Sequence, residues 1–179
     1  MASLRAFDDH LPRLGARVYV DAAAVVIGHV ELGDDASIWP QAVVRGDVAR
    51  IRIGARTNVQ DGAILHVTHA SAAVPAGWPC LVGADVTIGH AAVVHACTLE
   101  EACLIGMHAT VLDGAVVQHH ALVGAGALVA PGKIVGAGEL WVGNPARRVR
   151  RLSDAEIAAL DDSARRYVAL KDVYLALRT

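Results

Sequence analysis

Branched aliphatic residues recur every six positions along most of the chain. The series comprises Val20, Val26, Leu32, Ile38, Val44, Ile53, Val59, Leu65, Val82, Ile88, Val94, Leu99, Ile105, Val111, Val117, Val123 and Val129, with a few changes of spacing. A spacing of six fits neither the 3.6-residue period of a helix nor one long strand, but short strands separated by turns produce it. The pattern therefore predicts a solenoid in which each of these residues points into a common core.

Two further residue types follow the same repeat. Four residues after most aliphatic positions stands a small or slim residue that we expect to face inward: Ala24, Val30, Ala36, Ala42, Val48, Thr57, Ala63, Val86, Ala92, Thr98, Cys103, Ala109, Ala115, Ala121 and Ala127. We assign the turns to the glycines at positions 28, 33, 46, 54, 62, 83, 89, 106, 114 and 124, because glycine adopts turn conformations readily. The pattern resembles the hexapeptide-repeat proteins, and this resemblance implies a left-handed parallel β-helix with three faces.

The expected fold class is an all-β solenoid, a left-handed parallel β-helix with a C-terminal α-helix. Residues 1–17 form an N-terminal segment, 18–142 the β-helix with a loop at 70–80, 143–152 a connector and 153–179 the helix. Ser153 and Glu156 have the spacing of a capping box at the start of this helix. Its apolar stripe, which we expect to pack along the solenoid, consists of Ile157, Leu160, Ala164, Tyr167, Val168 and Tyr174.

Composition limits the possible partners. Hydrophobic residues make up 54% of the 179 positions but aromatic residues only 4%, so the core consists of small aliphatic side chains. No apolar run approaches the roughly 18 residues of a membrane span, and a net charge of -2 gives no electrostatic signature of nucleic-acid binding. We expect neither partner. The three cysteines lack metal or redox spacing, and the N-terminus lacks a signal-peptide pattern, which together favour a cytoplasmic protein with free thiols.

The repeat brings three of the nine histidines into two columns. Arg45, His66 and His95 each follow an aliphatic residue of the same face, so they should stack in one column if the loop bulges out of the solenoid. His90 falls on a different face, in register with Asp61. Roughly 16 Å of extended chain separates it from His95, which is too far for metal bonds near 2.0–2.1 Å within one chain. In a three-fold assembly, a neighbouring subunit could supply the third imidazole.

Three imidazoles with an open position are typical of a catalytic zinc centre, with Co²⁺ or Fe²⁺ as alternatives. The motifs around the histidines resemble the γ-class carbonic anhydrases: Trp39-Pro40, Arg45-Gly46-Asp47, Ile53-Gly54, Asn58-Val59-Gln60-Asp61-Gly62, His66-Val67-Thr68, and Gly89-His90 with His95. This resemblance implies a homotrimer with zinc or iron between its subunits, held by His66 and His95 of one chain and His90 of the next. The implied reaction is the reversible hydration of CO₂, a lyase reaction, by hydroxide formed when the metal lowers the pKa of bound water to about 7.

The resemblance also implies roles for three polar residues. Arg45 and Asp61 match a pair that forms a salt bridge across the subunit interface, and this pair could serve assembly as well as catalysis. Gln60 matches a residue that hydrogen-bonds the metal-bound water.

The chain departs from the family pattern at the usual proton-shuttle carboxylates. Val48 stands where the archetypal enzyme has a glutamate, and residues 67–79 contain no acid. His69 is the only ionisable group that this loop offers, and we expect it to be solvated.

Four functions therefore remain open, of which the first three take small-molecule substrates. The first is a γ-type carbonic anhydrase of weak or normal activity. The second keeps the metal but hydrolyses acyl-CoA thioesters, because the same nucleophile can attack either carbon. The third is a hexapeptide acyltransferase with a histidine base and no metal. The fourth is an assembly subunit that has kept the trimer but lost turnover.

Overall fold

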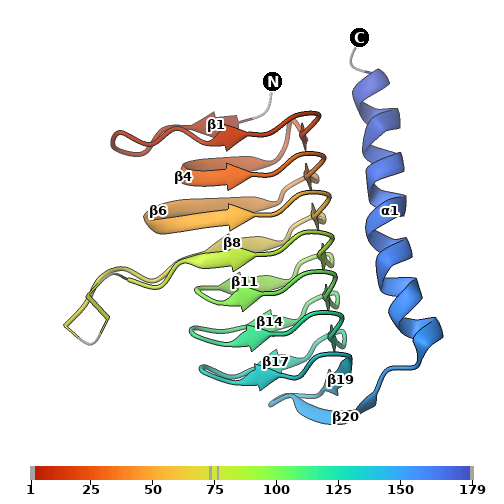
Figure 1. Cartoon of the computed structure of the whole chain (residues 1–179). Coiled ribbons are helices and arrows are strands. Elements are labelled where there is room, and N and C mark those ends of the chain that lie inside the picture. The colour runs from red at the N-terminus through yellow and green to blue at the C-terminus, as the bar shows by residue number, and fades with distance from the viewer. Residues whose placement is uncertain (1–2, 73, 76, 178–179) are drawn as a thin grey trace.

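The computed structural model describes residues 3–72, 74–75 and 77–177 of the chain. These residues form the expected left-handed parallel β-helix, and one long helix, α1 (Asp154–Ala176), lies along its side (Figure 1). Short strands stack in parallel on the strands of the preceding coil, and they build three faces around one core.

The strands of the three faces are mostly two or three residues long. The first face contains β3 (Tyr19–Val20), β5 (Ser37–Ile38), β7 (Asn58–Val59), β10 (Thr87–Ile88), β13 (Leu104–Ile105), β16 (Leu122–Val123), β19 (Glu139–Val142) and β20 (Arg147–Arg151). The second contains β1 (Ser3–Arg5), the first parts of β4 (Val25–Leu32) and β6 (Val43–Ile53), β8 (Ile64–His66), β11 (Val93–His95), β14 (Thr110–Val111) and β17 (Leu128–Val129). The third contains β2 (Arg13–Leu14), the second parts of β4 and β6, β9 (Cys80–Val82), β12 (Thr98–Leu99), β15 (Val116–Val117) and β18 (Ile134–Val135).

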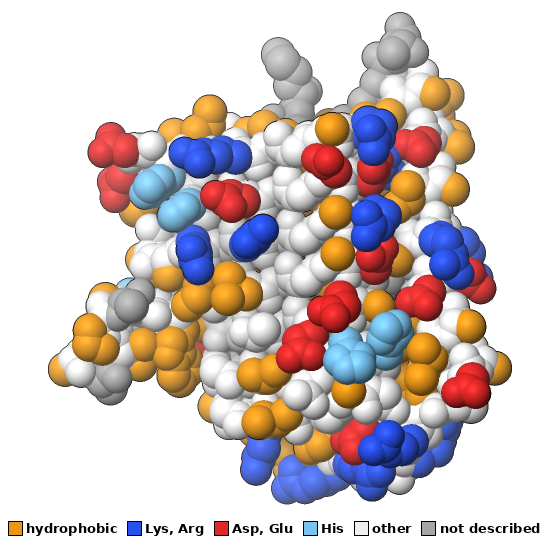
Figure 2. All heavy atoms as spheres, viewed as in Figure 1, with side chains coloured by type: hydrophobic (Ala, Val, Ile, Leu, Met, Phe, Trp, Pro, Cys, Tyr) orange, Lys and Arg blue, Asp and Glu red, His pale blue; other side chains and the backbone are white. Residues whose placement is uncertain are grey.

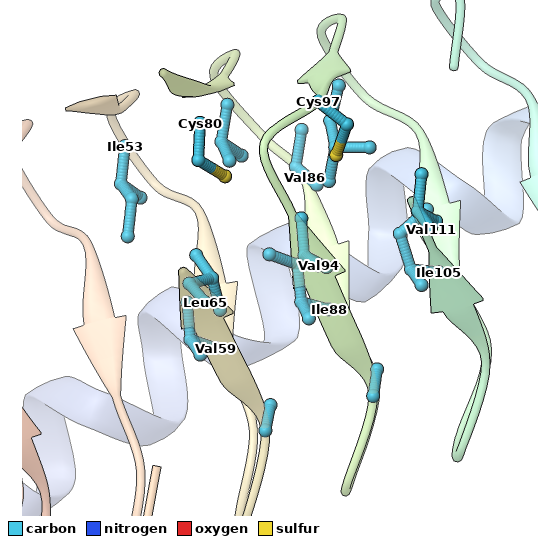
Figure 3. Packing of buried hydrophobic residues seen from close by; sticks show 14 of the residues in the cluster. Ile53, Val59, Leu65, Cys80, Val86, Ile88, Val94, Cys97, Ile105 and Val111 are labelled. Atoms are coloured by element: carbon cyan, nitrogen blue, oxygen red, sulfur yellow. The ribbon is translucent and has the colours of Figure 1, made fainter. Parts of the chain in front are cut away.

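Strand register places equivalent positions of successive coils in straight columns. On the second face Val44 pairs with Leu65, and Leu65 pairs with Val94. On the first face Val59 pairs with Ile88. The six-residue spacing predicts these columns, and the structure confirms them. Figure 3 shows aliphatic side chains of consecutive coils pointing into the same interior.

The two longest strands, β4 and β6, depart from the repeat. Both run from the second face onto the third, and Gly28 pairs with Gly46 whereas Val30 pairs with Ile51. This shift in register shows that β6 carries extra residues at the corner. Val48 lies among them and is 45% exposed. The expectation that Val48 faces inward is therefore wrong, because the bulge removes it from the repeat.

Close stacking, and not positive φ, accounts for most of the glycines assigned to turns. The glycines at positions 28, 62 and 114 have positive φ, but those at 33, 46, 54, 83, 89, 106 and 124 do not. At each of these seven, a Cβ would meet another atom at less than 3.0 Å, usually backbone of the next coil. Asp35, Arg56 and Asp85 instead adopt the left-handed conformation at corners, with φ of 58°, 59° and 59°. Several of these glycines do begin turns, because the carbonyl oxygens of Gly33, Gly89, Gly106 and Gly124 each accept a hydrogen bond from the amide three residues later. Glycine is needed at these corners for close stacking and not for positive φ.

The segments that flank the solenoid also contribute strands. Within the N-terminal segment, β1 and β2 pair in parallel with β4, and within the connector, β20 pairs antiparallel with β19. The loop leaves the solenoid between β8 and β9 (Figure 1). Thr68 and Trp78 form an antiparallel bridge at its neck. Residues 73 and 76 of the expected loop, and residues 178 and 179 of the expected helix, lie outside the described residues.

Helix α1 begins as the sequence predicts. Ser153 is the N-cap residue, and it forms a capping box with Glu156. Leu160 and Ala164 of the apolar stripe are buried, although Tyr174 is 41% exposed. The helix packs against β3, β5, β7 and β10, so it covers the first face of the solenoid and runs back towards the first coils (Figure 1).

The cysteines agree with the expectation of free thiols. All three cysteines are buried free thiols, and Figure 3 shows Cys80 and Cys97 in the core. Figure 2 shows Lys and Arg side chains gathered at the end of the solenoid that carries β20. In the described part of the chain, no helix combines the length and the hydropathy needed to cross a membrane.

Candidate metal centre

The parallel register of β8 and β11 brings two of the predicted metal ligands together. His66 pairs directly with His95, and Nδ1 of His66 lies 3.1 Å from Nε2 of His95. Their side chains are 20% and 30% exposed, so both rings lie at a partly buried surface. The structure therefore places these two residues side by side, one coil apart, as the repeat predicts.

Each of these imidazoles is held from behind by a carboxylate. Asp47 Oδ1 lies 3.1 Å from Nε2 of His66, and Asp113 Oδ1 lies 2.6 Å from Nδ1 of His95. Burial acts to raise the pKa of both carboxyl groups, but hydrogen bonds outweigh it and the pKa of each is lowered. Burial also lowers the pKa of His66. Because an ionised carboxylate only accepts hydrogen bonds, the ring nitrogen that faces each aspartate carries the proton.

The remaining ring nitrogens have the chemistry of metal donors. When each neutral ring carries its proton beside its aspartate, Nδ1 of His66 and Nε2 of His95 both present a lone pair, and these two nitrogens lie 3.1 Å apart. Two imidazoles bound to one tetrahedral metal at 2.0–2.1 Å would have their nitrogens about 3.3–3.4 Å apart. A carboxylate behind a metal-bound histidine is also a common arrangement. The pair therefore fits two ligands of one metal ion.

The third predicted ligand lies elsewhere on the same chain. His90 follows β10 on the first face, and its Nδ1 lies 3.0 Å from Oδ2 of Asp61. Its side chain is 41% exposed. Across the described residues, no group of three or more His, Cys, Asp or Glu side chains could hold a metal within one chain. The register of His90 with Asp61 is as predicted, and a site shared between chains stays a prediction.

Arg45 has a different partner within the chain from the one expected across an interface. Its guanidinium donates to Oδ2 of Asp47, the carboxylate that also contacts His66. Asp61 instead contacts His90. The pairing of Arg45 with Asp61 of a neighbouring subunit is untested and stays a prediction. Within one chain, Arg45 helps to fix the carboxylate behind His66.

Gln60 lies on the side of the solenoid that carries His90. Its side chain is 5% exposed, and Nε2 donates to Oδ1 of Asn58 over 3.0 Å. Gln60 and His90 line one groove of about 430 Å³, which continues between the solenoid and Tyr167 of α1. His69, by contrast, is exposed in the loop, in agreement with the expectation that it is solvated.

Sequence reasoning missed two carboxylates that build this centre. Asp47 belongs to the Arg-Gly-Asp motif, but its contact with His66 depends on the bulge in β6. Asp113 follows Val111, which pairs with Val94 just before His95. Reading two residues beyond each aliphatic position, instead of one, would have shown that Asp113 lies beside the histidine column.

Comparison with known proteins relates this geometry to a family. No family model matches the chain. Gamma carbonic anhydrase 2 of Arabidopsis thaliana mitochondria is 44% identical over 168 residues, which cover 93% of this chain and 59% of that protein. A probable carbonic anhydrase of Methanocaldococcus jannaschii is 42% identical over 159 residues, covering 89% of this chain and 96% of that one. The chain belongs to the γ-class carbonic anhydrase family.

A solved structure supports the same relationship at the level of the fold. The crystal structure of a hexapeptide transferase family protein from Anaplasma phagocytophilum superposes with a TM-score of 0.89 and 38% sequence identity. The match covers 96% of this chain and 98% of that one. The same β-helix therefore occurs in a protein described as a hexapeptide transferase. The fold alone does not identify the reaction.

Proposed function

We propose that this protein is a γ-type carbonic anhydrase, a lyase that catalyses the reversible hydration of CO₂ with a metal ion shared between subunits. The observation that carries the proposal is the approach of two imidazole nitrogens, Nδ1 of His66 and Nε2 of His95, to 3.1 Å. Membership of a family whose relatives are described as carbonic anhydrases adds support.

In this proposal His66 and His95 of one chain and His90 of the neighbouring chain hold the metal, in a homotrimer. Zinc suits three imidazoles with an open position, and Fe²⁺ or Co²⁺ suits the same donors. When bound, such a dication lowers the pKa of a coordinated water and supplies a nucleophile at neutral pH. The outward position of His90 supports sharing between chains, because it leaves the pair of His66 and His95 without a third ligand from the described part of its own chain.

The polar residues of the chain would orient the reactants. One N–H of Gln60 Nε2 donates to Asn58, which fixes the amide so that Oε1 could accept a hydrogen bond from the attacking water and direct its lone pair towards CO₂. Asp61 holds His90 at Nδ1, so Nε2 of that ring would be the nitrogen that binds the metal. Arg45 would reach across the interface towards Asp61 of the neighbour while it still holds Asp47.

The compartment is part of the same proposal. The three cysteines are buried free thiols. A hydrogen bond with Cys80, together with burial, raises the pKa of the Cys97 thiol, which keeps it protonated and unreactive. Free thiols of this kind are typical of a reducing compartment, so we place the protein in the cytoplasm.

The groove beside Gln60 supports a second candidate, hydrolysis of an acyl thioester. Its volume of about 430 Å³ exceeds what CO₂ needs, and Leu104, Leu122 and Met107 give it an apolar lining. An acyl chain lying in this groove would present its thioester carbonyl near His90. The groove shows only that there is room for a larger substrate, and the proposed metal ligands suit either reaction. Carbonic anhydrase activity remains the leading proposal because relatives of the chain are described as carbonic anhydrases.

Metal analysis of anaerobically purified protein, followed by two assays on the same sample, tests the proposal. We expect about one Zn²⁺, Fe²⁺ or Co²⁺ per chain in the wild type, and its loss in His95→Ala. CO₂ hydration should depend on that metal, and acyl-CoA hydrolysis should be much slower. A metal-free wild type, or a His95→Ala variant with unchanged metal content, would overturn the proposal, whereas faster thioester hydrolysis would favour the second candidate.

The buffer dependence of hydration tests the missing proton carriers. Val48 has no ionisable group and His69 is exposed in the loop, so neither serves as a proton carrier at the site. Regeneration of the nucleophile should therefore rely on buffer. We expect slow turnover in dilute buffer, acceleration by imidazole, and little change in His69→Ala. Fast turnover of His69→Ala in dilute buffer would show that another group carries the proton.

A further inference from the structure

We propose that Asp113 is a positioning residue that, together with Thr68, fixes the ring of His95 so that Nε2 faces the metal. This inference rests on the proposed metal site and extends it to Asp113, which lies outside the motifs, and to Thr68, the last residue of the His66-Val67-Thr68 motif. Asp113 and Thr68 act through His95 and would not touch the metal or the substrate.

Both oxygens of Asp113 are occupied by residues of other coils. Oδ1 lies 2.6 Å from Nδ1 of His95, and Oδ2 accepts a hydrogen bond of 2.5 Å from Oγ1 of Thr68. Thr68 follows β8, His95 ends β11 and Asp113 follows β14, so three successive coils meet at one carboxylate. Rotation of the carboxylate would break at least one of these contacts, and the orientation of the imidazole is therefore coupled to the position of Thr68.

Thr68 is itself held in place at the neck of the loop. It exchanges two backbone hydrogen bonds with Trp78, over 3.1 Å and 2.9 Å. The ring of Trp78 also lies over Gly114, where an added Cβ would come within 3.2 Å of the ring. The neck of the loop is thus clamped to the turn that carries Asp113. In this way the loop contributes to the alignment of a metal ligand although His69, at its start, points into solvent.

The chemical consequence is the choice of tautomer. A carboxylate at Nδ1 retains the proton there, and Nε2 of the neutral ring keeps its lone pair for the metal. An amide in place of the carboxylate can donate to Nδ1 instead, which would move the ring proton to Nε2 and block the donor. Loss of such an outer carboxylate typically weakens metal binding about 10–100-fold.

Asp113→Asn tests this role, with Asp85→Asn as a matched control. The Asp85 side chain is 29% exposed, close to the 27% of Asp113, and it pairs with Arg56 of a neighbouring coil at 2.6 Å without contacting a histidine. Nitrogen-15 NMR of the metal-free proteins reports the tautomer of His95. Competition with a chelator reports the affinity for Co²⁺. A structural role alone would leave the tautomer unchanged.

We expect the Nδ1–H tautomer in the wild type and in Asp85→Asn, and partial or complete conversion in Asp113→Asn. Co²⁺ affinity should fall about 10–100-fold in Asp113→Asn, less in Thr68→Val, and less than twofold in Asp85→Asn. A folded Asp113→Asn variant with an unchanged tautomer and unchanged affinity would overturn the inference. If Asp113→Asn does not fold, Thr68→Val decides in the same two measurements.

The same measurements separate this inference from the proposed function. A wild type that binds Co²⁺ no better than His95→Ala would refute the proposed metal site. The tautomer of the metal-free ring would still show whether Asp113 orients His95, because that measurement needs no metal.

Discussion

At the residue scale, glycines that stack on one another bring the backbones of neighbouring coils close together. A Cβ on Gly54 would lie 2.4 Å from the carbonyl carbon of Gly83 and 2.5 Å from the nitrogen of Ala84. A Cβ on Gly33 would lie 2.6 Å from the nitrogen of Ala55. Since these are backbone atoms, no rotation of a side chain could relieve the contact. The spacing between coils thus depends on the absence of a side chain at these positions.

We therefore predict that Gly54→Ala destabilises the fold by about 3 kcal/mol, because the coils must separate locally to admit the methyl group. Gly126→Ala is the control: Gly126 has φ of +67° and no atom within 4 Å of an added Cβ. It should lose only about 1 kcal/mol, from the left-handed backbone. Urea unfolding of both variants gives the two losses. Equal losses, or a larger loss at Gly126, would contradict the stacking argument.

The histidine column shows what residue-level sequence reasoning could and could not provide. His66 and His95 were predictable because parallel register copies one position onto the next, so a period alone makes them neighbours. The contact of Asp47 with His66 was not, because it depends on the bulge in β6, which breaks the period. Turn residues such as Asp35 were also missed, since many polar residues tolerate the left-handed corner and none marks it uniquely.

At the scale of elements, the junction between α1 and the solenoid combines rings with a buried charge. Tyr174 packs against Tyr19 and Trp39, with ring centroids 5.6 Å and 5.2 Å apart. The ammonium of Lys171 is fully buried and lies 2.8 Å from Oδ1 of Asp35. A hydropathy pattern counts lysine as polar, so the sequence predicted the apolar stripe of the helix but not this residue within it. The ammonium tolerates burial because the carboxylates of Asp35 and Asp172 pair with it.

We predict that Asp35→Asn lowers stability at neutral pH by about 1–2 kcal/mol, after allowance for solvent screening. A hydrogen bond from Arg17 and the nearby Lys171, opposed by burial, lower the pKa of Asp35 from 3.8 to about 2. A lowered pKa contributes stability above the ordinary value, and that contribution is lost as the pH falls from about 4 to about 2. The difference between the wild type and Asp35→Asn should therefore narrow across this range.

Urea unfolding at pH 7, 5, 4 and 3 measures this difference. Asp162→Asn serves as the control, because Asp162 also pairs with an arginine, Arg165, but on the exposed side of α1. Because water screens this exposed pair, Asp162→Asn should lose much less stability than Asp35→Asn. A gap between the wild type and Asp35→Asn that stays constant from pH 7 to pH 3 would show that the Asp35 carboxylate does not carry the effect.

At the scale of the whole molecule, the arrangement of the histidines points beyond one chain. His66 and His95 belong to the second face, whereas His90 follows a strand of the first face. Apolar side chains stay exposed around the first pair, with Ile64 44% and Trp78 36% exposed. Such a surface suits contact with another copy. The six-residue repeat predicts which face of the solenoid each histidine occupies. It does not predict how the faces of two chains meet, because that depends on contacts between chains.

The final prediction is that two inactive variants restore each other. His90→Ala retains His66 and His95, and His95→Ala retains His90, so a mixed trimer contains interfaces at which one chain of each kind supplies the missing group. In a head-to-tail ring with random exchange at equal concentrations, about one quarter of the interfaces would be intact. Metal content and hydration rate should both rise to about that fraction of the wild type. Isotope labelling of one variant, read by native mass spectrometry, confirms the exchange. The His90→Ala/His95→Ala double variant should show no recovery with itself. Proven exchange without any return of metal would mean that one chain holds the ion alone.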